Sequence, residues 1–256
     1  MVRTAALLAL TLLAGACSWL PEPRDETAGW SASRLYSAAR AAMDEGDYET
    51  AIHRYETLEA RYPFGRYAQQ AQLEVAYAYY KYGEPESAIA AADRFIKLHP
   101  RHPHVDYAWY LKGLVNFTRG SGFFDRFFPK DPARLDQSAL RQAYLDFAEL
   151  VRRFPASRYA ADARQRMIYL RNVMAEHEVA VAEFYMRRRA FVAAVNRARQ
   201  VVERYDGAPA MAEALAILVR AYRALDLPEL AADAERVLRL NFPDHPLAAG
   251  RGGGRG

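Results

Sequence analysis

The sequence contains very little cysteine, with one such residue among 256. A single thiol excludes an intramolecular disulfide framework and any zinc or iron–sulfur site that needs several cysteines. Fourteen glycines and thirteen prolines are too few for a low-complexity or collagen-like chain, and 12% aromatic residues exclude a disordered polymer. Because 52% of the residues are hydrophobic, we expect a folded protein with a substantial core.

A hydrophobic run long enough to cross a membrane is also missing. The apolar stretch from Ala5 to Ala16 has twelve residues, whereas a spanning helix needs about 20. Arg3 precedes this stretch, and a basic residue followed by a short apolar run is typical of a secretory signal. We therefore predict that residues 1–16 form a cleaved signal peptide.

The lone cysteine directly follows that stretch. Residues 13–17 read Leu-Ala-Gly-Ala-Cys and resemble a bacterial lipobox, in which the cysteine is lipidated and becomes the mature N-terminus. We expect Cys17 to carry a diacylglycerol and an N-acyl chain, which together anchor a domain durably. Ser18, in place of aspartate, resembles lipoproteins sorted to the outer membrane. The alternative is an ordinary signal peptide cut near Ala16, with Cys17 incidental.

A strong excess of one charge is absent as well. Without Arg3 the mature chain has 34 basic and 31 acidic side chains, and the two signs are interspersed. An exported chain with this balance is not expected to bind nucleic acid. The densest basic cluster, residues 187–189, is interpreted as a solvated helix end, where cations favour the negative pole of the helix dipole. A partner-binding role for Arg188 stays open.

An alanine and a helix stop recur twelve residues apart along the chain. An aromatic or histidine ring precedes each stop, and an apolar residue lies seven positions after each alanine. A small residue allows close helix approach, and proline ends a helix because it lacks an N–H. The pattern predicts an all-α fold, a tetratricopeptide-repeat (TPR) α-solenoid of five helix-turn-helix repeats. The five pairs are Ala51–Pro63, Ala88–Pro100, Ala143–Pro155, Ala194–Asp206 and Ala231–Pro243.

The spacing of the alanines places insertions in the middle of the solenoid. The intervals are 37, 55, 51 and 37 residues, so the third and fourth repeats are longer. The first insertion holds four phenylalanines between Phe123 and Phe128, which either cover a groove or form a partner-binding protrusion. The second contains no Gly or Pro and predicts a helix of about 45 Å from Arg158 to Arg188. The expected organisation is a tether over 17–31, N-terminal repeats and the start of repeat three over 32–117, an aromatic loop over 118–137, C-terminal repeats over 138–243, and a disordered Gly/Arg tail over 244–256.

The sequence contains no complete catalytic motif. No serine stands in a Gly-x-Ser-x-Gly elbow, and His177-Glu178 lacks the second histidine of a metalloprotease helix. His99, His102 and His104, with Asp106, lie in a proline-punctuated loop and are interpreted as a locally bonded loop rather than a metal site. We therefore expect no catalytic residue, no metal and no cofactor other than the lipid. A peptidoglycan-cleaving enzyme would need a globular catalytic domain, for which five repeats leave no room.

Binding is the remaining function, because stacked helical hairpins present an inner face that takes peptides. Aromatic residues concentrate in the first two repeats. Tyr79 falls on the packing face and is expected to be structural. Tyr62, Phe64 and Tyr67 lie in the connecting segment and are the candidates for binding an extended hydrophobic substrate segment.

Several segments together resemble one known family. They are Arg61-Tyr62-Pro63-Phe64-Gly65, Gln69-Gln70-Ala71-Gln72-Leu73, Ala76-Tyr77-Ala78-Tyr79-Tyr80-Lys81, Asp93-Arg94-Phe95-Ile96, His102-Pro103, Val181-Ala182-Glu183-Phe184-Tyr185 and Val195-Asn196-Arg197. This set resembles the BamD (ComL) family, the TPR lipoproteins of the β-barrel assembly machine in Gram-negative outer membranes. The likeness covers the mature chain apart from the tether and the tail.

The resemblance implies a non-enzymatic assembly factor, anchored by lipid at the periplasmic face of the outer membrane. It implies that the N-terminal repeats bind the targeting segments of unfolded outer-membrane proteins. The C-terminal repeats would dock on the periplasmic domains of the central barrel subunit, with Arg197 at that contact, and accessory lipoproteins would complete the assembly. A periplasmic TPR adaptor that coordinates cell-wall growth or division is the alternative.

Overall fold

The computed structural model describes residues 25–119 and 137–249. Throughout these residues the regular secondary structure is helical, and they contain no strand. The helices are α2 (Ala32–Glu45), α3 (Tyr48–Arg61), α4 (Arg66–Tyr82), α5 (Pro85–Leu98), α6 (Val105–Thr118), α7 (Gln137–Arg153), α8 (Ala160–Arg187), α9 (Phe191–Arg204), α10 (Met211–Ala224), α11 (Pro228–Asn241) and the short α12 (Pro246–Ala249). The predicted all-α solenoid is confirmed; the number of repeats stays a prediction.

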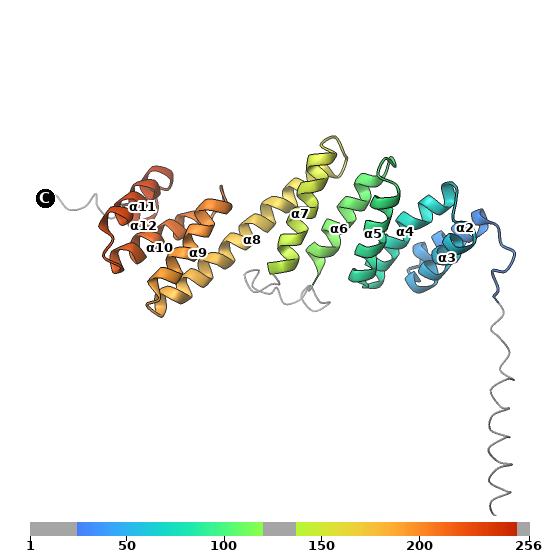
Figure 1. Ribbon diagram of the computed structural model, residues 1–256, viewed down its shortest axis with the longest axis horizontal. Helices are drawn as coiled ribbons and strands as arrows, with labels where there is room; N and C mark the ends of the chain where they lie inside the picture. The colour runs from blue at the N-terminus through green and yellow to red at the C-terminus, as the bar shows by residue number, and fades with distance from the viewer. Residues whose placement is uncertain (1–24, 120–136, 250–256) are drawn as a thin grey trace, which may run out of the picture.

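Each helix packs against the next one along the chain, which produces an elongated array with the N-terminal helices at one end and α11 and α12 at the other (Figure 1). Alternate helices also meet, since α2 contacts α4, α4 contacts α6, and α8 contacts α10. These first helices of successive pairs form the inner layer, as stacked helical hairpins require.

The recurring alanines belong to the buried core. Four of the five are fully buried and Ala231 is 3% exposed. The apolar residues seven positions later, Leu58, Phe95, Leu150, Val201 and Leu238, are all fully buried. At each stop the backbone N–H of the ring residue still donates to the carbonyl four residues earlier, as Tyr62 does to Leu58 at 2.8 Å. The alanine pattern thus predicts which face of every second helix is buried and where that helix ends.

The turns between paired helices need a residue in the left-handed region. Gly46 and Gly83 serve at φ +80° and +88°, where glycine has no steric penalty. The same positions five residues before Ala194 and Ala231 hold Arg189 and Asp226, at φ 58° and 57°. Because left-handed backbone disfavours side chains that carry a Cβ, the two later turns are strained relative to the two earlier ones.

Helix α8 is continuous over 28 residues, a length of about 42 Å. This agrees with the long helix expected between Arg158 and Arg188. The C-terminal hydrophobic cluster extends from Leu140 to Ala248 and includes the buried face of α8, whereas a separate cluster extends from Leu35 to Val115. A small third cluster, made of Leu73, Phe95, Val105 and Ala108, falls within the sequence range of the N-terminal cluster.

Two boundaries differ from the sequence expectation. The predicted tether reached residue 31, but residues 25–31 pack on the first hairpin: Arg61 donates to the Thr27 carbonyl at 2.6 Å, and Trp30 contacts the N-terminal core. The tail was expected from residue 244, but α12 forms there and buries Ala248. In both places a local packing contact stabilises a segment whose composition suggested none. Residues 1–16, Cys17, the phenylalanines between 123 and 128, and residues 250–256 lie outside the described residues.

Candidate functional site

A groove of about 630 Å³ lies on the inner layer of the N-terminal half. Helices α2, α4 and α6 supply most of its wall, and residues at the N-terminal ends of α3 and α8 complete it. Its lining consists of Arg40, Met43, Asp44, Tyr48, Leu73, Glu74, Tyr77, Lys81, His104, Tyr107, Arg158 and Tyr159. The groove therefore combines aromatic rings with charges of both signs.

Tyrosine rings form the end of the groove nearest α8. The rings of Tyr107 and Tyr159 have centroids 5.4 Å apart, and Tyr110 stacks on Tyr159 at 4.7 Å. Burial raises the pKa of the Tyr107 hydroxyl, so this group stays protonated at neutral pH. Such surfaces offer apolar faces together with hydroxyl donors, a combination that suits peptide side chains and backbone.

The wall of the groove contains a carboxylate held by three donors. Glu74 accepts hydrogen bonds from the hydroxyls of Tyr36 and Tyr55 at 2.7 and 2.5 Å and from the Arg40 guanidinium at 3.2 Å. Tyr55 comes from α3 and is fully buried. Because the three donors fix the carboxylate, Glu74 joins α2, α3 and α4 at the wall of the groove.

None of the three predicted substrate residues is among the residues that line this groove. Tyr62 uses its hydroxyl to donate to the Trp30 carbonyl at 2.7 Å and is 37% exposed. Tyr67 packs on the ring of Tyr36, with centroids 5.5 Å apart, and so connects to the groove through Glu74. Phe64 is 91% exposed. Of the three, Phe64 is the ring most accessible to a ligand.

The two predicted partner-binding arginines have different neighbours in the fold. Arg197 of α9 pairs with Glu178 of α8 at 3.0 Å, and Glu178 also accepts from Gln200 at 3.1 Å. The Arg197 side chain remains 42% exposed. Arg188 caps the end of α8, where its guanidinium lies over the Phe184 ring at 4.6 Å. Arg197 thus has a structural contact that its sequence position did not reveal.

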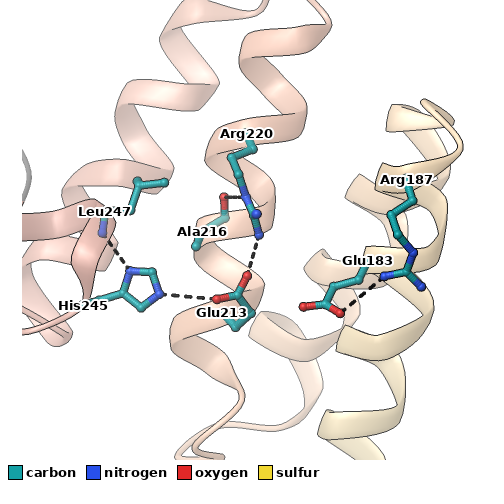
Figure 2. Close-up of polar contacts among 7 residues, drawn as sticks. All are labelled: Glu183, Arg187, Glu213, Ala216, Arg220, His245 and Leu247. Carbon is teal, nitrogen blue, oxygen red and sulfur yellow. Dashed lines mark hydrogen bonds and ion pairs between the residues drawn. The ribbon is translucent and has the colours of Figure 1, made fainter.

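Ion pairs lie on α8 and α10 in the C-terminal half. Figure 2 shows Glu183 paired with Arg187 on α8, at 3.8 Å, beside Glu213 and Arg220 on α10, at 2.5 Å. Glu213 also contacts His245 Nε2 at 3.4 Å. His245 Nδ1 accepts from the Leu247 N–H at 3.3 Å, which assigns the ring proton to Nε2 and attaches the segment before α12 to α10.

The histidines before α6 are bonded within the fold. His99 Nε2 lies 2.6 Å from the Gln72 side-chain oxygen, and His102 Nδ1 accepts from the His104 N–H at 3.1 Å. Asp106 accepts from the Ser157 hydroxyl at 2.6 Å. Within residues 25–119 and 137–249 no three His, Cys, Asp or Glu side chains are grouped as metal ligands.

Sequence reasoning missed most of the groove. Its residues come from four helices and from the turns before α6 and α8, and Glu74, Tyr107 and Tyr159 carry no local motif. The tyrosines of α4 were the available signal, because their density exceeds what one packing face needs. Only the stacking of α2, α4 and α6 places them beside the start of α8.

The family described as the outer membrane lipoprotein YfiO matches residues 29–238. An outer membrane protein assembly factor BamD from Neisseria meningitidis serogroup B is 48% identical over 86% of this chain and 83% of its own length. The proteins of that name from Xylella fastidiosa (strain Temecula1) and Vibrio cholerae are 39% and 38% identical, over 96% and 92% of this chain and 84% and 96% of their own lengths.

Among solved structures, the TPR domain of P58(IPK) aligns with 85% of this chain and 53% of its own chain, with a TM-score of 0.41 and 16% identity. No helix in the described ranges combines the length and apolar composition needed to cross a membrane.

Proposed function

The chain belongs to the YfiO family of outer membrane lipoproteins, whose relatives include BamD, and we propose from this that it is an outer-membrane protein assembly factor. It acts by binding rather than by catalysis. The observation that supports binding as its mode of action is the tyrosine-rich groove of about 630 Å³ on the inner layer of α2, α4 and α6. A periplasmic TPR adaptor for cell-wall growth is not favoured, since the curated relatives carry the assembly-factor name.

The groove suits an extended apolar segment of an unfolded β-barrel protein. Tyr77, Tyr107 and Tyr159 supply rings against which apolar side chains lose water-exposed surface, worth about 25 cal/mol per Å² buried. Arg40, Lys81 and Arg158 add cations that can pair with a terminal carboxylate. The exposed ring of Phe64 and the ring of Tyr67 extend the aromatic surface toward the turn before α4.

The C-terminal repeats dock on the periplasmic domains of the central barrel subunit. The exposed part of Arg197 and the guanidinium of Arg188 are the proposed contacts, because arginine can bind a partner carboxylate with two hydrogen bonds. Accessory lipoproteins complete the assembly. The chain itself is attached to the periplasmic face of the outer membrane by the lipid on Cys17, with no further cofactor and no nucleic-acid partner.

Two measurements test the proposal. The tagged full chain, purified from detergent-solubilised outer membranes, should retain a large β-barrel protein that has periplasmic domains. A photoreactive phenylalanine analogue replacing Tyr77 should crosslink to an unfolded β-barrel protein whose last residue is phenylalanine. The matched control carries the analogue at Glu229, an exposed position on α11. Equal crosslinking at both positions, or a purified chain without any barrel protein, contradicts the proposal.

A further inference from the structure

A second groove lies over the middle of α8, away from the tyrosine groove. It consists of two adjacent cavities of about 200 and 300 Å³, which share Tyr144 of α7 and Arg171 of α8. Their combined lining is Arg141, Tyr144, Arg164, Met167, Ile168, Arg171, Met174, Arg204 and Tyr205, here called the arginine groove. Helix α7, helix α8 and the end of α9 supply these residues.

The charge of this lining is one-sided. Four of the nine lining residues are arginines and none is acidic, although the whole chain has 35 basic and 31 acidic side chains. None of the four pairs with a carboxylate of the described residues, whereas most other arginines of α7–α11 do. Four cations around these two adjacent cavities, none paired with a carboxylate of the described residues, repel one another and favour an anionic ligand.

One of the cations is held in place by backbone. Arg171 donates to the carbonyls of Asp206 and Gly207 at 2.8 and 2.9 Å, which connects α8 to the turn after α9. Gly207 has φ +71°, and a Cβ there would lie 3.2 Å from Arg171 Nη1. Arg141, Arg164 and Arg204 are exposed around this fixed centre.

The floor of the arginine groove is apolar. Met167, Ile168 and Tyr144 line the wider cavity, and the Ile168 side chain is 46% exposed. A flat anionic membrane would contact cations that project from an open surface. Cations that flank an apolar floor instead match a chain segment that carries acidic and apolar side chains together.

We propose that the arginine groove binds a segment of a partner protein whose acidic side chains pair with Arg141, Arg164 and Arg204 while its apolar side chains fill the floor at Met167 and Ile168. The site is independent of the tyrosine groove and of the substrate assigned to it. It gives the chain a protein-binding surface on α7 to α9, in addition to the tyrosine groove and to the docking contacts proposed at Arg188 and Arg197.

The test uses the full chain in detergent and a fluorescent 18-residue synthetic peptide with glutamate and leucine on opposite helix faces. Fluorescence anisotropy gives its Kd, which should rise at least tenfold in the Arg141→Glu, Arg204→Glu double variant and also rise as sodium chloride increases. The control, Lys97→Glu with Arg101→Glu, makes the same charge change at the exposed end of α5 and should leave the Kd within about twofold.

A third variant, Ile168→Ser, removes apolar floor without changing charge and should weaken the peptide severalfold. Equal weakening by the Lys97 and Arg101 control, or equal binding of a lysine–leucine peptide, overturns the proposal. It is also overturned if the double variant loses only its affinity for phosphatidylglycerol mixed micelles, because the cations would then serve a lipid surface.

Discussion

Arg197 of α9 donates a hydrogen bond of 3.0 Å to Glu178 of α8, whose side chain is only 7% exposed. Gln200 is the second donor to the same carboxylate. The pair therefore holds the long helix to its partner. The resemblance assigned Arg197 to a partner contact, whereas in the structure Arg197 makes a contact within the fold. Replacing Arg197 therefore affects stability as well as any binding.

Replacing Arg197 with glutamate should destabilise the protein by about 2 kcal/mol, because a second carboxylate then faces the buried Glu178. Urea unfolding followed by circular dichroism measures the loss. Arg199→Glu is the matched control, since Arg199 pairs with the exposed Glu203, and should cost about 0.5 kcal/mol or less. Identical midpoints for the two variants would show that the buried pair contributes nothing.

Gly113→Ala should destabilise α6 although alanine is the better helix former. An added Cβ at Gly113 would lie 2.4 Å from Phe147 Cε1, so the ring of α7 must move. Overpacking of this kind costs about 1–3 kcal/mol. Adding Phe147→Leu should recover part of the loss in the double variant. A Gly113→Ala midpoint at or above the wild-type value rules the clash out.

Asp146 should make stability depend on pH in a direction opposite to most carboxylates. Burial raises the pKa of Asp146 above its ordinary value of 3.8, against the opposing charge of Lys112. The folded state then binds the proton more tightly, so the stability from this group is complete below pH 3.8 and declines as pH rises toward the folded pKa.

The comparison that isolates this effect is wild type against Asp146→Asn, unfolded in urea between pH 4 and pH 7. The stability of the variant relative to wild type should increase as pH rises through the window above 3.8. The prediction is wrong if the difference in the free energy of unfolding between wild type and Asp146→Asn stays constant between pH 4 and pH 7. The free energies of unfolding also include the hydrogen bonds that Asn116 and Gln142 donate to residue 146, but these two amides do not titrate.

Phe64→Ala should weaken binding of a peptide ending in phenylalanine without changing stability, because the ring is 91% exposed. Tyr67→Ala should weaken binding and also lower the unfolding midpoint, since Tyr67 packs on Tyr36. Anisotropy with a labelled peptide and urea unfolding separate the two effects. If the Tyr62→Ala, Phe64→Ala double variant keeps wild-type affinity for the peptide, the turn between α3 and α4 does not take part in peptide binding.

Cys17→Ala should release the chain from membranes, because acyl chains that each contribute about 0.8 kcal/mol per buried methylene are then absent. Ultracentrifugation of lysed cells measures the distribution between pellet and supernatant. A Ser18→Ala variant keeps the thiol and should remain in the membrane pellet. Sedimentation of Cys17→Ala with membranes counts against lipid anchoring.

The sequence alone was sufficient for features governed by neighbours in the chain. Helix ends at the five stops, the burial of the alanines and the length of α8 all follow from spacing, because periodicity and proline act within one or two turns. Resemblance in the segments around Tyr62 and Val181 was sufficient for the family.

Tertiary structure decided the features that join distant segments. The Glu74 carboxylate meets donors from α2 and α3, Arg197 meets Glu178, and residues 25–31 fold onto Arg61. The arginine groove gathers side chains from α7, α8 and α9. Each depends on how successive helices cross, and crossing is set by side-chain packing across the layer, which no local pattern in the sequence records.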